Sequence, residues 1–250
     1  MSLQYISTKS TVFHPDAMTD SQEFVLIYGD EVDTTDVQQN GRDEVIYRGR
    51  TGWVRSDRLM QEHPLEMYCI DVGQGDSFFI VTPVGRRILI DGGTGHEAFQ
   101  FLVWKYRLDL PTATPIDIDL LVVSHADADH LAGLVSIVAH PLIRVKEIVH
   151  SGIGRYNSGF DTELGDTDGL GINRVLITRH DGIGDLDGED LKDTMALWRD
   201  AVKAEPGLIY RAVDATTGTI DIGDPDVSLH VLGPRLEARA SYVKPVFPWL

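Results

Sequence analysis

The sequence of 250 residues is poor in cysteine, in basic residues and in long apolar runs. Its one cysteine, Cys69, has no second cysteine with which to form an internal disulfide, and this fits a reducing compartment. No apolar run is long enough to span a bilayer, and the N-terminus lacks the basic and then apolar segments of a signal peptide. We therefore expect a cytoplasmic protein that does not bind membranes, in which Cys69 is a buried, unreactive thiol within a strand.

The deficit of positive charge limits the classes of binding partner. Lysine and arginine together number 22 against 39 acidic residues, which gives a formal net charge of −17. A protein that coats nucleic acid without sequence preference needs basic residues to neutralise phosphates, so the composition argues against that class. It does not exclude a nuclease, because bound metal ions can supply positive charge inside an acidic site.

The N-terminal quarter has the pattern of a small antiparallel β barrel. Residues 23–59 contain short alternating segments interrupted by glycine and aspartate. Within them, "YGDEVD" and "GRTGWVRSDRL" resemble bacterial Src-homology-3-like domains. We assign residues 1–62 to such a barrel with an N-terminal lead-in, and the resemblance implies a protein partner for it.

From Met67 the pattern changes to that of an α/β domain. The predicted elements are a β hairpin at 67–83, strands at 84–93, 118–123 and 144–152, and helices at 96–110, 131–138 and 189–204. Apart from Asp119, the run at 118–123 is apolar, as expected of a strand that is buried on both faces. Residues 153–171 are rich in Gly, Asp, Ser and Asn, which predicts a long loop.

The segment "SHADADH", residues 124–130, places four metal-binding side chains on one loop: His125, Asp127, Asp129 and His130. The loop follows a buried strand, where α/β folds usually place their chemistry, and we expect the next helix to begin at Asp129 or His130. Two adjacent carboxylates repel each other unless a cation lies between them, so the pattern predicts a metal site. The alternative is a solvated turn with an aspartate that caps the helix, which would leave both histidines unexplained.

The same segment resembles the first metal motif of the metallo-β-lactamase superfamily, His-x-(His/Asp)-x-Asp-His. Two upstream segments, "DVGQGDSFFI" (71–80) and "GRRILIDGG" (85–93), are similar to the opening of its ComEC-like branch, which is typified by the soluble domain of a DNA-uptake channel protein. The resemblance implies an α/β fold over residues 66–250, namely the first half of an αββα sandwich. The second half would begin about where the sequence ends. We therefore expect a longer natural polypeptide, a completing partner chain in an oligomer, or a degenerate remnant.

The resemblance also implies which residues bind metal. His125 and Asp127 would hold one divalent ion and Asp129 and His130 the other, with Asp129 and His130 as the catalytic residues. Two metals about 3.5–4 Å apart can share a hydroxide that is nucleophilic at neutral pH. Asp127 stands where many relatives have a second histidine, and a carboxylate there shifts the preference from zinc toward manganese or magnesium.

Three further residues are candidates for the site. Each metal needs more ligands than the motif contains, and His180, at the end of a predicted strand, is the candidate for the third ligand of the first metal, with His150 as its rival. The resemblance implies that Asp91 lies close to the metal loop and supports the ligands, and Asp76 is assigned a similar supporting role. The alternative for both aspartates is a turn position beside glycine.

Three functions remain open at this point. The resemblance favours a metal-dependent hydrolase of phosphodiesters, with nucleic acid or a nucleotide as substrate. A hydrolase of a thioester, lactone or amide is the alternative within the superfamily. The third is a degenerate metal domain that acts only as a binding module, with the N-terminal barrel recruiting a partner.

Overall fold

The computed structural model describes residues 2–157, 167–168, 175–176, 179–239 and 242–246. The chain divides into two compact units: unit 1 is Met1–Glu66 with Thr82–Gly85, and unit 2 is Met67–Val81 with Arg86–Leu250. That residues 1–62 and 66–250 are separate domains stays a prediction.

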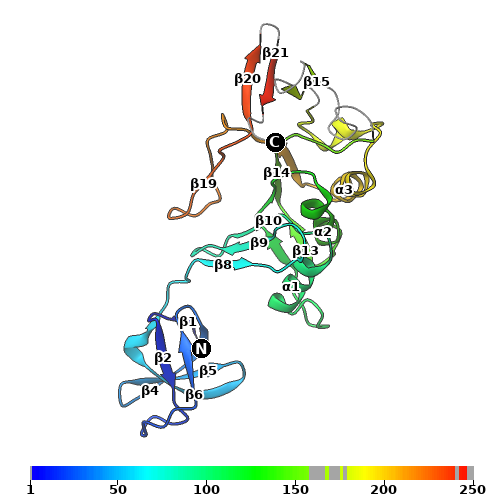
Figure 1. Cartoon of the computed structure of the whole chain (residues 1–250). Coiled ribbons are helices and arrows are strands. Elements are labelled where there is room, and N and C mark those ends of the chain that lie inside the picture. The colour runs from blue at the N-terminus through cyan, green and yellow to red at the C-terminus, as the bar shows by residue number, and fades with distance from the viewer. Residues whose placement is uncertain (1, 158–166, 169–174, 177–178, 240–241, 247–250) are drawn as a thin grey trace. The chain divides into compact units, whose positions relative to one another are not determined.

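Unit 1 is built from antiparallel strands (Figure 1). One sheet has the order β6-β5-β4-β1-β7 and contains β1 (Ser2–Ile6), β4 (Glu31–Gln39), β5 (Arg42–Tyr47), β6 (Arg50–Arg55) and β7 (Leu59–Met60). The other pairs β2 (Ser10–Phe13) with β3 (Phe24–Ile27), and a 3-10 turn, η1, covers Ser56–Arg58. The predicted antiparallel strands are confirmed, but no sheet among the described residues closes into a barrel.

The core of unit 1 is small and tightly packed. Its buried residues are Ile6, Phe13, Leu26, Val32, Val45 and Val54. The ring of Phe13 stacks on Phe24 with 4.4 Å between ring centroids. It also lies against Gly52, where a Cβ atom would come within 2.2 Å of the ring, so this position of β6 accepts no side chain.

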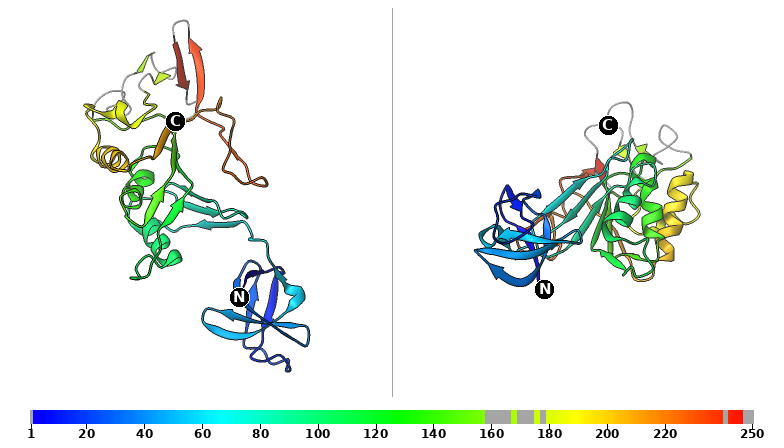
Figure 2. Two further views of the ribbon diagram at one scale, coloured as in Figure 1. Left: turned by 180° about the vertical axis from the view of Figure 1, so that it is seen from behind. Right: turned by 90° about the horizontal axis from the view of Figure 1, so that it is seen from below.

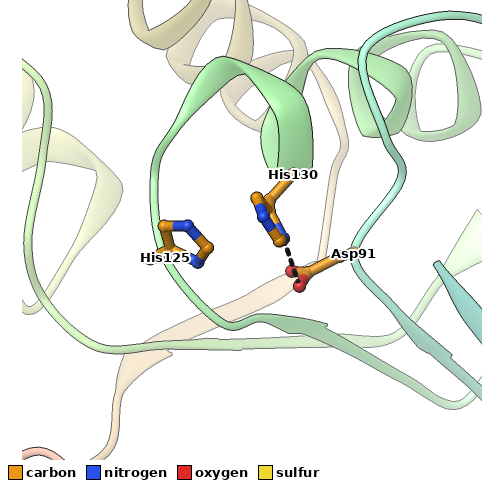
Figure 3. A group of neighbouring side chains, drawn as sticks. All are labelled: Asp91, His125 and His130. Carbon is orange, nitrogen blue, oxygen red and sulfur yellow. Dashed lines mark hydrogen bonds and ion pairs between the residues drawn. The ribbon is translucent and has the colours of Figure 1, made fainter. Parts of the chain in front are cut away.

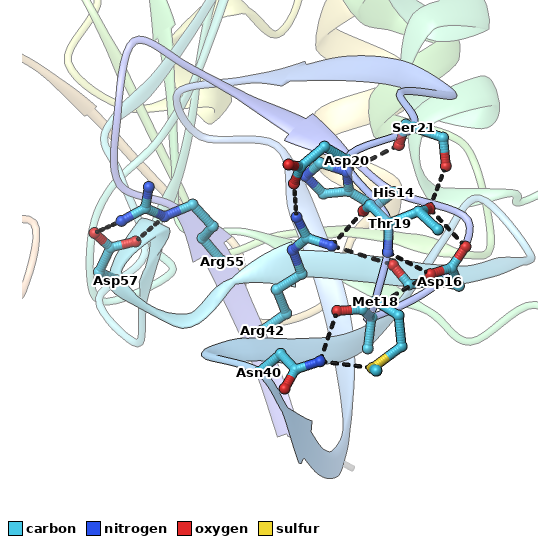
Figure 4. Close-up of polar contacts among 11 residues, drawn as sticks. His14, Asp16, Met18, Thr19, Asp20, Ser21, Asn40, Arg42, Arg55 and Asp57 are labelled. Carbon is cyan, nitrogen blue, oxygen red and sulfur yellow. Dashed lines mark hydrogen bonds and ion pairs between the residues drawn. The ribbon is translucent and has the colours of Figure 1, made fainter.

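The loop between β2 and β3 is ordered by polar contacts rather than by burial (Figure 4). The carboxylate of Asp16 accepts hydrogen bonds from the backbone N–H groups of Met18 and Thr19 at 2.8 and 2.7 Å. The hydroxyl of Thr19 also donates to it and is the main reason that the pKa of Asp16 lies below its ordinary value. Arg42 of β5 donates to the Thr19 carbonyl at 2.6 Å and to Asp20 at 2.7 Å, which ties the loop to the sheet.

Unit 2 contains a six-stranded mixed sheet with three helices along one face (Figures 1 and 2). The sheet order is β17-β14-β12-β10-β9-β8, with β8 (Glu66–Cys69), β9 (Phe78–Val81), β10 (Arg87–Ile90), β12 (Leu120–Val123), β14 (Glu147–His150) and β17 (Ile209–Ala212). The helices are α1 (Glu97–Tyr106), α2 (Ala128–Val138) and α3 (Asp193–Ala204). Strands β10, β12, β14 and β17 run parallel, so their carboxyl ends lie along one edge of the sheet.

The remaining elements of unit 2 are short. They are β11 (Ile116–Ile118), β13 (Ile143–Val145), β15 (Thr167–Asp168), β16 (Val175–Leu176), the 3-10 turn η4 (Ile183–Leu186), β18 (Thr219–Ile220), β19 (Leu229–His230), β20 (Arg235–Arg239) and β21 (Tyr242–Val246). No helix among the described residues is long and apolar enough to cross a bilayer.

Both faces of the sheet in unit 2 are apolar. Leu89 and Leu121 face the helices and belong to the main core, whereas their neighbours Ile88 and Leu120 belong to a second cluster on the opposite face. This alternation explains why β12 is apolar throughout, and the predicted strand at 118–123 begins in the structure only after Asp119. The second face also carries a cavity of about 550 Å³. Its apolar lining includes Val122, Val149, Val213, Ile220 and Leu229. The α/β prediction is confirmed.

Three local predictions need correction. Cys69 is exposed rather than buried, because β8 is the edge strand of the sheet. Helix α2 begins at Ala128, one residue before the predicted start, and α3 begins at Asp193 rather than near residue 189. The loop predicted at 153–171 lies mostly outside the described residues, which there are 153–157 and 167–168.

We predict that Phe13→Ala selectively unfolds unit 1, since deleting a fully buried phenylalanine from so small a core costs about 3–5 kcal/mol. Hydrogen exchange should show lost protection of the backbone amides of β4 and β5, with unchanged protection in α2. The exposed Leu3→Ala serves as the control. Equal loss of protection in both units would contradict their independent folding.

Candidate metal centre

The loop 124–130 lies at the carboxyl end of β12, beside the carboxyl end of β10. Asp91, the residue after β10, donates its backbone N–H to the Val122 carbonyl at 3.0 Å. In return, the backbone N–H of Ser124 donates to Asp91 Oδ1 at 2.8 Å. The parallel pairing of the two strands therefore brings the turn at Asp91 and the histidine–aspartate loop into direct contact.

The buried carboxylate of Asp91 contacts His130 directly (Figure 3) and His125 through the hydroxyl of Ser124. His130 donates from Nδ1 to Asp91 Oδ2 at 2.9 Å, and the hydroxyl of Ser124 donates to the same oxygen at 2.5 Å. Because that hydroxyl proton is used on Asp91, Ser124 Oγ accepts from His125 Nδ1, which lies at 2.9 Å. Each neutral imidazole that donates from Nδ1 has its lone pair on Nε2, the form that binds metal.

Potential ligand atoms converge in two overlapping sets. Asp91, His125 and His130 each contribute one atom within 4.8 Å of the others, and so do His125, Asp127 and Asp129. The ring centroids of His125 and His130 are 3.9 Å apart, and His125 Nε2 lies 3.8 Å from Asp127 Oδ2. Imidazole nitrogen and carboxylate oxygen are donors that zinc and manganese accept, so this donor set fits a divalent ion.

Asp127 is held by an arginine. It is the N-cap residue of α2, but its side chain makes no capping hydrogen bond. Its carboxylate accepts instead from Arg155 Nε at 2.7 Å and pairs with Nη2 of the same guanidinium. The carboxylate of Asp127 therefore pairs with Arg155 and does not cap the helix.

Close backbone approaches position the loop and the first turn of α2. A Cβ atom on Gly75 would lie 1.7 Å from the carbonyl oxygen of Asp129, and one on Gly133 would lie 2.0 Å from that of Gly92. The backbone N–H of Gly92 donates to the His130 carbonyl at 2.8 Å. Because these positions are glycine, the backbone at Gly75 can pack against Asp129, and the backbone at Gly92 can pack against the first turns of α2.

Two other predicted residues belong to neither ligand set. Asp76 is exposed on the loop before β9. His180 is 2% exposed and stacks on His150, with 4.7 Å between ring centroids, and its Nε2 lies 3.2 Å from the hydroxyl of Tyr210. His150 Nδ1 accepts from the backbone N–H of Gly152 at 3.0 Å. The structure therefore pairs His180 with its predicted rival His150 and gathers the four motif residues with Asp91; metal binding by any of them stays a prediction.

Burial lowers the basicity of this histidine pair. The pKa of His180 falls to about 4 and that of His150 well below its ordinary value, in both cases mainly because the charged imidazolium would lose its hydration. His150 Nε2 and His180 Nδ1 have no hydrogen-bond partner in the described part of the chain. Both rings are therefore neutral at pH 7.

Sequence reasoning missed two residues of the centre. Ser124 begins the quoted motif, and its place at the end of a predicted strand was a usable signal. Arg155 had no such signal, because it lies 28 residues beyond Asp127 in a glycine-rich stretch.

We predict that Gly75→Ala weakens metal binding at least about tenfold, the lower range for residues that support ligands. The added methyl group would displace the backbone of Asp129. Gly73→Ala is the matched control, because Gly73 also has a positive φ (+74°, against +86° at Gly75) but has open space around it. Titration calorimetry with Zn²⁺ and Mn²⁺ measures both affinities, and equal losses in the two variants would exclude the contact as the cause.

The histidine pair also predicts a dependence of stability on pH. The folded-state pKa of His180 is below its unfolded value, so the unfolded chain binds more protons between about pH 6.5 and 4. Stability from this residue is full above that window and is lost on acidification, by roughly 2 kcal/mol between pH 7 and pH 5. Hydrogen exchange in α3, corrected for intrinsic rates, should show this loss in the metal-free protein. His180→Phe should reduce it and the exposed His96→Gln should not; an unchanged slope in His180→Phe would refute the assignment.

Comparison with known proteins places these observations in a family. A model of the metallo-beta-lactamase superfamily matches residues 70–208, a span that contains the turn at Asp91, the whole loop 124–130 and all three helices of unit 2. Searches of curated proteins and of solved structures each returned no match. Since the matched span is more than half of the 250 residues, the chain belongs to the metallo-β-lactamase superfamily.

Proposed function

We propose that unit 2 is a metal-dependent hydrolase of phosphodiesters from the ComEC-like branch of the superfamily, with nucleic acid or a nucleotide as substrate. Membership of the superfamily suggests metal-dependent hydrolysis. The observation that carries the proposal is the convergence of Asp91, His125 and His130 with His125, Asp127 and Asp129 at one strand end. Because Asp91 holds His130 Nδ1, the ligands that we assign to a pair of divalent ions, zinc or manganese, are His125, Asp127, Asp129 and His130, with Asp127 favouring manganese or magnesium.

A divalent ion at these residues supplies a lowered pKa for bound water and a positive charge that polarises the phosphoryl oxygen. The residues of the chain do the rest. His125 and His130 present Nε2 in fixed orientations, because Ser124 and Asp91 hold their Nδ1 atoms. Asp129, in the first turn of α2, is the carboxylate that we assign to accept a proton from the attacking water.

The acidic composition is compatible with a phosphodiester substrate. A chain of net charge −17 attracts a polyanion poorly, so positive charge must be local to the site. Bound divalent ions provide it, which makes binding of the substrate and hydrolysis depend on the same four side chains of the motif. This dependence distinguishes the proposed hydrolase from a degenerate binding module, which would neither bind metal nor hydrolyse a substrate.

We expect the double variant Asp129→Ala/His130→Ala to lose at least one metal ion per chain and all hydrolysis, because two convergent ligands are removed. Elemental analysis measures the metal, and a panel of bis(p-nitrophenyl) phosphate, single-stranded DNA, a thioester, a lactone and an amide measures activity. The control replaces the exposed Asp200 and His96 with alanine. Unchanged metal content in the double variant, or preferential cleavage of a substrate other than the phosphodiesters, would overturn the proposal.

A further inference from the structure

A cavity of about 390 Å³ lies directly beside the predicted metal ligands. One wall is the loop and the first turn of α2, and the other is Arg155 with the start of α3. Its lining residues are Ala126, Asp127, Ala128, Asp129, Arg155, Lys192, Asp193, Thr194 and Met195. The cavity therefore joins the acidic motif to two cationic side chains, Arg155 and Lys192.

These two cations come from distant parts of the chain and are held together by the backbone. The N–H of Lys192 donates to the carbonyl of Arg155 at 3.0 Å, and the N–H of Asn157 donates to that of Asp190 at 2.8 Å. Between these bonds, Tyr156 forms an antiparallel bridge with Leu191. Tyr156 and Leu191 are 5% and 7% exposed and belong to the main core. The backbone under both cations is therefore firmly anchored.

Contacts across the cavity fix the position of Arg155 relative to the motif. Its side chain is 22% exposed and its guanidinium donates to Asp127, whose side chain is 35% exposed. An arginine side chain has five N–H donors in a planar fork, so it can hold a carboxylate and a phosphate group at the same time. Lys192 adds a second positive charge, on a flexible side chain.

The charge of the cavity depends on metal. Among the described residues that line the cavity, three carboxylates, of Asp127, Asp129 and Asp193, outnumber the two cations. Divalent ions bound at Asp127 and Asp129 offset those carboxylates, and the two cations then dominate. The cavity should therefore bind an anion only when divalent ions are bound at Asp127 and Asp129.

We propose that this cavity is a phosphate subsite, in which Arg155 and Lys192 bind a phosphate group of the substrate. The inference deepens the proposed function and rests on it, because the positive sign of the cavity requires metal at the motif. The phosphate is either the scissile group or a neighbouring group along a nucleic acid chain. In both cases Arg155 and Lys192 determine specificity, and Arg155 in addition positions Asp127.

Binding of inorganic phosphate tests the subsite without relying on catalysis. Titration calorimetry on the manganese-loaded full chain should show binding that is at least tenfold weaker in Arg155→Gln/Lys192→Gln. The metal-free wild-type chain should bind phosphate equally poorly. Arg144→Gln and Lys203→Gln are matched controls, because both residues pair with aspartates outside the cavity and should leave the affinity within twofold. Manganese affinity is measured separately, and each phosphate titration is run at saturating manganese, because Arg155 also positions Asp127.

Kinetics then distinguish the two phosphates and separate this inference from the proposed function. A raised KM for bis(p-nitrophenyl) phosphate in the double variant identifies the scissile phosphate, and a raised KM for an oligonucleotide alone identifies a neighbouring one. Unchanged phosphate affinity with full metal content, in an enzyme that cleaves phosphodiesters, overturns the subsite alone. Phosphate binding that depends on Arg155 and Lys192, in a chain that cleaves only other substrates, supports the subsite and overturns the proposed function.

Discussion

The centre depends on one buried carboxylate. Asp91 is 3% exposed and has a φ of +56°, a left-handed conformation that residues other than glycine seldom adopt. Burial of a charged oxygen is unfavourable unless donors surround it, and Ser124 and His130 are those donors. The same hydrogen bonds determine which nitrogen of each imidazole carries the proton. The stability of the turn and the metal-binding form of the histidines therefore have a common origin.

Features that are contiguous in sequence could be predicted from it. The apolar run before the motif, its four potential metal ligands and the amphipathic helices are local patterns. The structure places the loop at the carboxyl end of a strand buried on both faces. Parallel neighbours follow from such runs, because only strands covered on both faces are apolar throughout. That the turn at Asp91 lies close to the motif was implied by the family resemblance, and the pairing of β10 with β12 brings the two into contact.

Features that depend on strand order could not be predicted. The ring of His150 stacks on Tyr210 because β14 and β17 are neighbouring strands. Arg155 and Lys192 lie side by side because the backbone pairs at the bridge between Tyr156 and Leu191. Neither contact is accompanied by a periodic pattern or a motif in the sequence that would predict it. Cys69 shows the same limit, since its exposure follows from the place of β8 at the sheet edge. The start of α2 was misplaced by one residue, because the apolar spacing from Leu131 onward does not mark the first turn of the helix.

The glycines behind the centre have a consequence for how this sequence can evolve. At Gly75, Gly92 and Gly133 another segment of the chain occupies the space of a side chain. A predicted ligand such as Asp127 could be exchanged for histidine, because either residue offers a donor atom to a metal ion. No residue is smaller than glycine, so these three positions offer no substitute. Among divergent relatives, these three glycines should therefore vary less than some of the predicted metal ligands that they support.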